Sequence, residues 1–526
     1  MRCEISSRVR LFSPAVVMFL VLGGGLASAA AEVSPAAEAT SPVEKVVAGS
    51  SEKSPRFVLP RSQALAALVG QETIDVVADR DGHFVESLAP FLWDDDDQSF
   101  FVETSDLNSA VDVGRLYNRE TRAAEARLEQ AEAQADQSLS LLLPTVSVRV
   151  SRGYEKSEPS VEIDEATGEL IESDLHMRTD ASLTVNQPLF DLPTYFDWRR
   201  RQAKQEARQE NLRSSDGDAY ISTVSSYLAL VASRLQIDMT RDFEGQLSEL
   251  LSYIEKRTEA GAASVSDAAR VQARSQATRS SRLEQESSHA AAGIEFVRLT
   301  NTVPKQLRLP VPADIGAVRL PATFKDAVAT AMLSNPEITT LLAEVKAVKS
   351  DQTAANGRFL PRLNAEYTDT YSRNAGGGGD SQRDKRLMMV FNWELYAGSK
   401  DSLYLGELSS RYHELRYRLD DQRRQVVQAL LANYSALETT RKRLDSGYEE
   451  LSAIATAAEA MSKRMLTGNQ SLLDLLDVYD RYYQARSRLV DLHVFEMNTI
   501  AQILRLTVGA PWLADAAAEA SSGLVN

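Results

Sequence analysis

Two stretches of this chain are too long and too regular for the helices of a compact domain. Neither residues 194–303 nor residues 362–510 contain a proline, and within each stretch apolar residues recur every three or four positions. This spacing is typical of helices that pack side by side as coiled coils. A continuous helix over Thr194–Glu259 would be roughly 100 Å long at about 1.5 Å per residue. The sequence therefore predicts an extended assembly of helices.

Each long helix is predicted to end at a glycine and to be followed by a helix that runs back. The second of these turns contains Gly468, a polar stretch at 469–471 and then an apolar and acidic run. Glycine after a periodic segment is a helix-stop signal, and Ser471 with Asp474 fits a capping box that starts the next helix. An earlier copy of this turn lies 207 positions before it, with Gly261, Ser264 and Asp267 at the matching places.

The two turns belong to a duplication of the chain. Pro144 and Pro361 are 217 positions apart, whereas Asn186 and Asn392 are 206 apart. A change of offset confined to one place indicates a longer surface loop in the first copy. In each copy a short helical piece and a returning helix are predicted to stack end to end beside the long helix. These pieces are Ser105–Leu142 and Ser264–Thr300 in the first copy, and Phe324–Phe359 and Ser471–Thr507 in the second.

The duplication divides the chain into segments. We interpret residues 1–31 as a signal peptide, 32–104 as a partly disordered N-terminal extension without an assigned role, 105–303 as the first repeat, 304–322 as a connector with a short strand, 323–512 as the second repeat and 513–526 as a disordered tail.

The first residues have the features of a secretory signal. Three arginines precede an apolar run and a cleavage site of the Ala-x-Ala type. Cys3 is the only cysteine and lies within this segment, so we expect neither a disulfide nor a lipid-anchored cysteine in the mature protein. The formal net charge of −16 argues against binding to nucleic acid, which requires a basic surface.

Where the offset changes, the sequence predicts two β-hairpins. Their arms alternate at period two over Pro144–Val150 with Arg178–Gln187, and over Arg362–Tyr371 with Leu387–Leu395. Four strands of about ten residues match the length of tilted outer-membrane strands. A small soluble four-stranded sheet fits the same pattern, and periodicity alone does not decide between the two.

In this order, and twice, these features resemble the TolC family of outer-membrane efflux and secretion channels. The resemblance covers residues 105–512. It is carried by the tip from Gly468 to Asp477, by the Leu-Pro pairs that enter the strands, and by Gln187–Asp191 at the end of the first hairpin. The extension 32–104 lies outside it.

The resemblance implies a fold that is mainly α with β. Each chain would give four strands to a trimeric, 12-stranded transmembrane β-barrel, and its helices would give a long coiled-coil helical barrel in the periplasm. It also implies three kinds of partner besides outer-membrane lipid: two further copies of the chain, a periplasmic adaptor (membrane fusion protein), and an inner-membrane pump of the ABC or RND type. The physics agrees, because four strands cannot close a barrel and a membrane tolerates no open sheet edge.

The resemblance also implies where the functional residues lie. Acidic residues of the family's pore constriction match Asp474 and Asp477, which a threefold axis would arrange as two rings of carboxylates that favour cations. Alternatively, these are ordinary carboxylates at a helix N-terminus. The counterpart of Asp477 in the first repeat is Arg270, so the second repeat alone would carry the constriction.

Further roles follow from the same resemblance. Family positions that lock the closed state match Met465 and Gln470 here, which cannot make the same bonds, so Arg464 or Lys463 would have to substitute. The adaptor is expected to contact the tips at Gly261, Ser264, Asp267, Gly468 and Ser471. Phe190, Trp393 and Tyr396 are expected at the membrane interface, although a packed equatorial core would suit them as well.

No enzyme is expected, and neither a cofactor nor a metal. The five histidines are scattered without metal-ligand spacing, and no nucleophile elbow or phosphate loop occurs. The predicted function is that of an outer-membrane exit duct in a tripartite system. The missing lipidation cysteine favours type I secretion over drug or metal efflux. A periplasmic coiled-coil scaffold without a channel is the remaining alternative.

Overall fold

A computed structural model of the chain describes residues 68, 70–75, 101–156, 166, 168, 175–315, 320–377, 379–396, 398–466 and 471–510. All of them belong to one unit, Val58–Asn526. The predicted signal peptide, most of the extension, Gly468 with Gln470, and the tail 513–526 lie outside the described residues.

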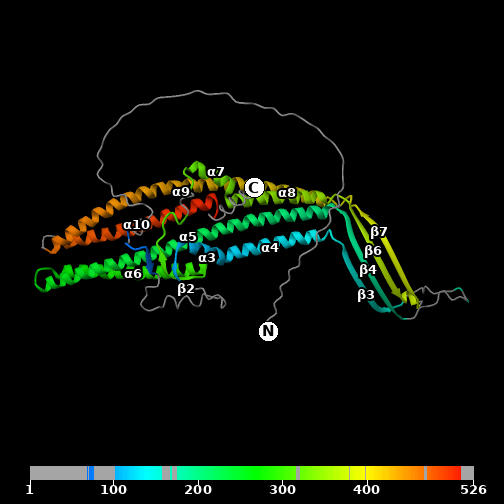
Figure 1. The fold of residues 1–526 in the computed structure, drawn as a ribbon, viewed down its shortest axis with the longest axis horizontal. Coiled ribbons are helices and arrows are strands. Elements are labelled where there is room, and N and C mark those ends of the chain that lie inside the picture. The colour runs from blue at the N-terminus through cyan, green and yellow to red at the C-terminus, as the bar shows by residue number, and fades with distance from the viewer. Residues whose placement is uncertain are drawn as a thin grey trace, which may run out of the picture. The chain divides into compact units, whose positions relative to one another are not determined.

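Two long helices, each with a returning partner, dominate the structure (Figure 1). Helix α5 spans Leu192–Glu259 and α9 spans Lys400–Leu466; α6, Val265–Thr300, and α10, Leu472–Thr507, run back along them. The predicted returning helices are therefore confirmed. Helix α5 begins two residues earlier than expected, because Pro193 fits in the first helical turn, where a missing N–H costs no hydrogen bond. Its side-chain cap is Asp191, which accepts from the Thr194 amide at 3.0 Å.

The turn between α5 and α6 is built as the sequence predicts. Gly261 has φ +73°, a left-handed conformation that glycine adopts without strain. The Ala262 amide then donates to the Arg257 carbonyl at 2.7 Å, which closes the end of α5. Ser264 caps α6 by accepting from the Ser266 amide at 3.1 Å.

The short helical piece predicted in each repeat is helical, but it consists of two helices. The first is broken into α3, Leu107–Tyr117, and α4, Arg119–Ser140; the second is broken into α7, Phe324–Ser334, and α8, Pro336–Gly357. The break falls on Asn118 and Asn335, the same place in both repeats. Each asparagine has an extended ψ and its side chain caps the helix that follows, so it ends one helix and starts the next.

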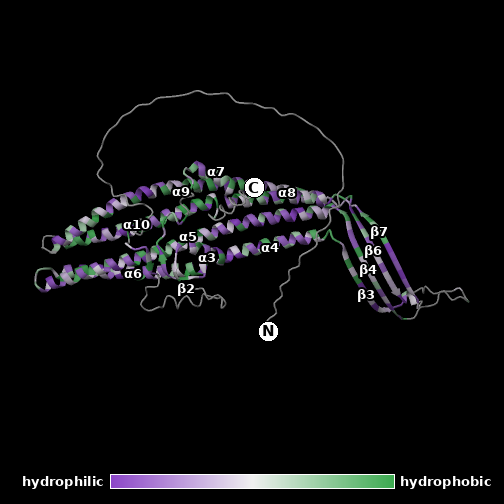
Figure 2. Ribbon diagram, viewed as in Figure 1, coloured by the Kyte–Doolittle hydropathy of each residue, from purple (hydrophilic) through white to green (hydrophobic). Residues whose placement is uncertain are grey.

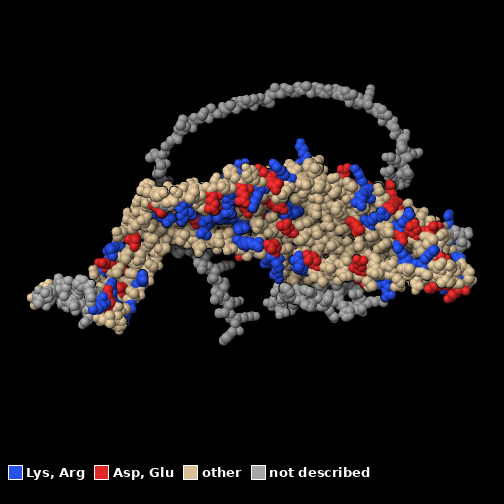
Figure 3. Space-filling view, turned by 180° about the vertical axis from the view of Figure 1, so that it is seen from behind, with Lys and Arg blue, Asp and Glu red and all other residues tan. Residues whose placement is uncertain are grey.

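The predicted stacking of short helices is confirmed. Helices α4 and α6 both pack along α5, and α8 and α10 both pack along α9. Helix α5 also contacts α8 and α10, which joins the two repeats side by side. Figure 2 shows hydrophilic and hydrophobic residues mixed along the helices, and Figure 3 shows basic side chains gathered over the half next to the sheet, with acidic ones among them. None of the described helices is apolar over a stretch long enough to cross a membrane.

The four predicted strands form one antiparallel sheet in the order β3-β4-β6-β7. They span Thr145–Glu155, His176–Asp191, Arg362–Arg373 and Ser381–Asn392. The last strand was predicted at 387–395 and is in fact six residues earlier at its start. Just before it the Asn374 amide donates to the Asp380 carbonyl at 2.8 Å, and Ser381 already pairs with Arg373 at the end of β6.

A second, three-stranded sheet joins the extension to the connector. Its order is β1-β5-β2, with β1 at Thr73–Asp75, β5 at Val303–Arg308 and β2 at Phe101–Ser105. Tyr227 of α5 fastens it, because its buried hydroxyl donates to the Arg308 carbonyl at 2.6 Å and contacts the Ser105 carbonyl at 3.1 Å. The extension thus contributes two strands, and the repeat boundaries at 105 and 303 both fall inside strands.

The asparagine breaks give a matched test. Asn335 is fully buried, accepts from the Ile338 amide at 3.0 Å and donates to the Leu506 carbonyl of α10 at 2.8 Å. Asn118 makes only the local cap, at 2.9 and 3.2 Å. We expect Asn335→Ala to lower the free energy of unfolding by about 2–3 kcal/mol and Asn118→Ala by about 1 kcal/mol. Thermal melting of the helical circular-dichroism signal measures both, and equal losses would contradict the tertiary role of Asn335.

Two glycines of α5 and its turn allow a second test. A Cβ at Gly261 or at Gly245 would meet open space, but only Gly261 has a positive φ. We expect Gly261→Ala to destabilise by about 1 kcal/mol, because alanine is strained there, and Gly245→Ala to stabilise by up to about 1 kcal/mol. Melting temperatures that move in the same direction would show that backbone conformation does not govern the turn.

Candidate functional site

The tips of the two hairpins pack against each other through a small apolar cluster. It contains Leu250 and Ile254 of α5, Val271 of α6, Met465 of α9, and Leu472 and Leu475 of α10. Tyr253 adds a polar link, since its hydroxyl donates to the Met465 carbonyl at 3.3 Å. The Arg257 guanidinium lies over the Tyr253 ring, 5.8 Å from its centre. The tips of the two repeats therefore form one structural unit.

The start of α10 differs from its prediction. Ser471 is the N-cap residue as expected, but its side chain makes no capping hydrogen bond. Leu472 and Leu475 are buried in the tip cluster, and this packing holds the first turn of α10 in place of a capping box. Gly468, the predicted turn glycine of this tip, lies outside the described residues.

The two carboxylates predicted for the constriction lie on the exposed side of the same helix. Asp474 and Asp477 are both exposed, one turn apart, while the leucines between them face the tip cluster. Asp477 pairs with Arg481 of its own helix, Oδ2 to Nε at 2.9 Å. Within one chain, the described residues contain no group of three or more His, Cys, Asp or Glu side chains that could hold a metal ion.

In the first repeat the matching charges cancel. Asp267, the counterpart of Asp474, lies 3.8 Å from the guanidinium of Arg270, the counterpart of Asp477. The tip of the second repeat therefore carries two acidic groups in the positions where the first repeat carries an ion pair.

Sequence reasoning missed an ion pair that joins the two hairpins near their tips. Arg274 of α6 donates through Nε to Asp480 Oδ1 of α10 at 2.9 Å. The predicted substitute Lys463 instead pairs with Glu459 on its own helix at 2.6 Å, and Arg464 lies in the last turn of α9. A signal existed, because Arg274 and Asp480 are opposite charges at nearly equivalent positions of the two returning helices.

At the other end of the helices, the predicted interface aromatics lie where the sheet begins. Phe190 is 46% exposed near the end of β4 and pairs with Leu363, which in turn pairs with Phe391. The Trp393 indole N–H donates to the Phe359 carbonyl at 3.1 Å, and its ring meets Phe391 edge to face. Tyr396 is 79% exposed and follows the strand. Phe391 was not predicted, although it completes this row.

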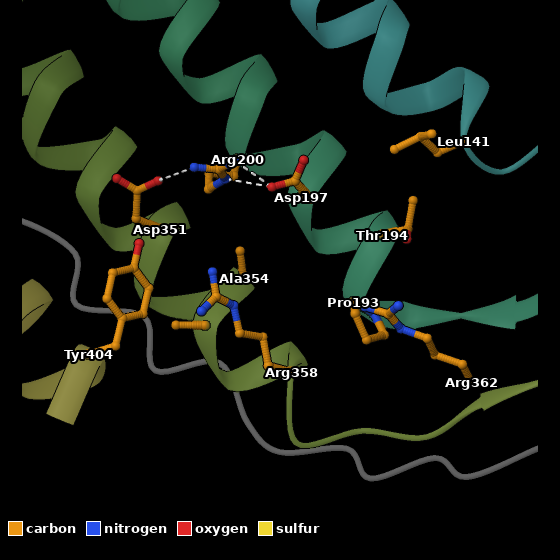
Figure 4. A pocket seen from close by; sticks show the side chains of 11 residues that line it. Leu141, Pro193, Thr194, Asp197, Arg200, Asp351, Ala354, Arg358, Arg362 and Tyr404 are labelled. Atoms are coloured by element: carbon orange, nitrogen blue, oxygen red, sulfur yellow. Dashed lines mark hydrogen bonds and ion pairs between the residues drawn. The ribbon is translucent and has the colours of Figure 1, made fainter. Parts of the chain in front are cut away.

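A polar pocket of about 240 Å³ lies at the junction of sheet and helices (Figure 4). Asp351 is almost fully buried there, 3.2 Å from Lys204 Nζ and 3.6 Å from Arg200. Burial opposes the charge of Asp197, but hydrogen bonds from Arg201 and Ser138 and the nearby Arg200 keep the pKa of its carboxyl below the usual value. These paired charges stiffen the junction.

The family model for outer membrane efflux proteins matches residues 115–302 and 327–498. The chain is 22% identical over 313 residues to the alkaline protease secretion protein AprF of Pseudomonas aeruginosa. This alignment covers 59% of the present chain and 65% of the relative. It is 22% identical over 437 residues to the pyoverdine export outer membrane protein OpmQ of the same organism, 78% and 86% of the two chains.

Solved structures show the same fold. The crystal structure of CusC matches with a TM-score of 0.66 at 14% identity, over 78% of this chain and 94% of that one. The predicted resemblance, the helical barrel with a β contribution, and the outer-membrane location with a periplasmic extension are thereby confirmed. Because the family model covers both repeats, the chain belongs to the outer membrane efflux protein family.

Proposed function

We propose that this protein is the outer-membrane exit duct of a tripartite export system. Three copies would close a 12-stranded barrel and a helical tunnel, an adaptor would contact the tips, and an inner-membrane ABC or RND pump would supply the substrate. The observation that carries this proposal is the four-stranded sheet, whose outer strands β3 and β7 have no partner within the described chain. Lipid cannot satisfy the backbone groups of an open edge, so neighbouring copies must pair with them.

The scaffold alternative requires a soluble sheet with a covered apolar face. Val146, Val148 and Val150 of β3 are 65%, 70% and 67% exposed, so no described element covers them. This arrangement favours a sheet that meets lipid.

We infer the class of cargo from the names of the relatives and from the cysteine content. The names of the two relatives refer to secretion of a protease and export of pyoverdine, so they support both classes of cargo. Type I protein secretion is our first candidate, because the only cysteine lies in the predicted signal peptide and leaves no lipidation site. Small-molecule efflux is the second. Gel electrophoresis of unheated outer membranes tests the duct itself: we expect a trimer, and a soluble monomer without conductance in lipid bilayers would refute it.

In the trimer, Asp474 and Asp477 would each form a ring of three carboxylates at the entrance. Their exposed position, away from the tip cluster, leaves them available to line a pore. The adaptor would contact the surrounding tip residues, Gly261, Ser264, Asp267, Gly468 and Ser471.

The carboxylates have a direct electrical test. We expect Asp474→Ala with Asp477→Ala to keep the channel conducting in planar bilayers but to lose most of its cation selectivity and its block by multivalent cations. Asp267→Ala is the matched control, because Asp267 occupies the place of Asp474 in the first repeat, where Arg270 stands in place of the second carboxylate. Selectivity that is unchanged in the double variant, or equally changed in the control, would remove these residues from the constriction.

The Arg274–Asp480 pair would help to hold the entrance closed. An exposed pair of this kind contributes up to about 1 kcal/mol, which corresponds to about a fivefold change in a closed-to-open ratio per subunit. We therefore expect Arg274→Ala to raise the open probability in bilayers. Arg298→Ala is the control, because Arg298 pairs with Glu295 within α6. An unchanged open probability for Arg274→Ala would exclude the pair from gating.

A further inference from the structure

The sheet has one apolar face and one mainly polar face, and its register shows which residues belong to each. Side chains in one register row point to the same side of the sheet. The apolar face carries the pairs Val146–Val185, Val148–Leu183 and Val150–Ala181 on β3 and β4, and Leu363–Phe391, Ala365–Met389 and Tyr367–Leu387 on β6 and β7. Val185 pairs with Tyr367, which joins the two sets on one side. In a barrel this is the side that faces lipid.

The apolar band is stepped across the sheet. On β3 and β4 it reaches Val150 and Ala181, but on β6 and β7 it ends at Tyr367 and Leu387, four register positions nearer the helices. A plane parallel to the membrane crosses tilted strands at different residues. Across three strand spacings of about 4.8 Å and at a tilt of about 40°, the crossing point moves by about 12 Å along the strand, or about four residues. The step in the apolar band is also four residues, so the edge of the band runs parallel to the surface of a membrane that surrounds tilted strands.

Just beyond the band, the same face becomes basic. Lys385 follows Leu387 on β7, Arg383 follows Lys385, Arg373 ends β6, and Arg152 follows Val150 on β3. We call Arg152, Arg373, Arg383 and Lys385 the cationic rim; all four are exposed. The one acidic residue among them on this face is Asp369, whose carboxylate accepts from Arg383 at 2.9 and 2.7 Å and so orients its guanidinium.

The rim lies at the outer surface of the membrane. Its end of the sheet is opposite the end that joins the helices, and the helices extend into the periplasm. Arg152 lies on one open edge of the sheet and Lys385 on the other. Closure of the proposed barrel would bring the Arg152 of one copy next to the Lys385 of its neighbour, so the rim would become a continuous cationic belt.

We propose that the cationic rim binds the phosphate groups of the phosphorylated glycolipid of the outer leaflet, lipopolysaccharide. Guanidinium and ammonium groups at the lipid boundary match its phosphates in charge, and the apolar band below them matches its acyl chains. Exposed Tyr154 and Tyr371 on the same face suit the interface between the two. This inference rests on the proposed barrel and adds its lipid partner.

The test uses the delipidated full-length trimer in detergent, with bisphosphorylated lipid A as the probe. We expect Arg152→Gln with Lys385→Gln to weaken binding by at least about tenfold, because two charges toward phosphate are lost. The matched control is Arg149→Gln with Arg386→Gln, on the same two strands but on the polar face, where binding should be unchanged. The pair Arg383–Asp369 is left intact, so Asp369 keeps the guanidinium that hydrogen-bonds it when its register neighbour Lys385 is changed.

Three results would overturn the proposal: equal binding of dephosphorylated lipid A, equal loss in the control variant, or equally effective competition by phosphatidylglycerol. Conductance in planar bilayers is measured on the wild type, the rim variant and the control variant. It distinguishes a failure of the rim proposal from a failure of the barrel proposal. A conducting trimer with unchanged lipid A binding refutes the rim alone. A wild-type protein that neither trimerises nor conducts refutes the barrel on which the rim depends.

Discussion

Backbone hydrogen bonding at the edges of the four-stranded sheet is the constraint on which the rest of the structure depends. Strands β3 and β7 each leave one side unpaired in the single chain. In water such an edge is an aggregation risk, and in lipid it is far less favourable, because no solvent replaces the missing bonds. A chain that places this sheet in a membrane must therefore meet other copies. Assembly and membrane insertion become a single requirement.

The helices extend far from the sheet and are held together without a globular core. Each long helix is accompanied over its length by two shorter ones, and the apolar contacts are divided between a large cluster around Tyr227 and a small cluster at the tips. The tip cluster has six buried residues, far fewer than the large cluster, so it is the weaker of the two. A weak apolar cluster with a few polar bridges fits the opening that we propose for this end of the helices.

Much of this architecture could be predicted from the sequence, because duplication and period give strong signals. The returning helices begin and end within a residue of their predicted bounds, since glycine and serine at a turn have local backbone consequences. The breaks at Asn118 and Asn335 were missed. Both asparagines cap the helix that follows, and Asn335 also donates to the Leu506 carbonyl, which is a tertiary contact that a local pattern does not show. The start of β7 was missed because residues 381–386 are all polar or charged, so they show no alternation of apolar and polar positions.

The candidate site could also be predicted only in part from the sequence. The family resemblance pointed to Asp474 and Asp477. For the Arg274–Asp480 bridge the sequence offered only opposite charges at nearly equivalent positions, because the contact itself depends on how the two hairpins pack side by side. The strands of the extension were missed for a related reason. β1 and β2 flank the connector strand β5, and a three-residue strand such as Thr73–Asp75 has no periodicity of its own.

The duplication also explains why the two repeats are not interchangeable at the tip. Two identical repeats would place the same charges around the whole entrance, and six acidic tips would repel one another strongly in a narrow opening. Replacement of one carboxylate by Arg270 in the first repeat neutralises every second tip. The proposed opening would then stay acidic, while far fewer pairs of like charges would face one another. In the proposed trimer, divergence of the repeats at this position would give an entrance with three acidic tips instead of six.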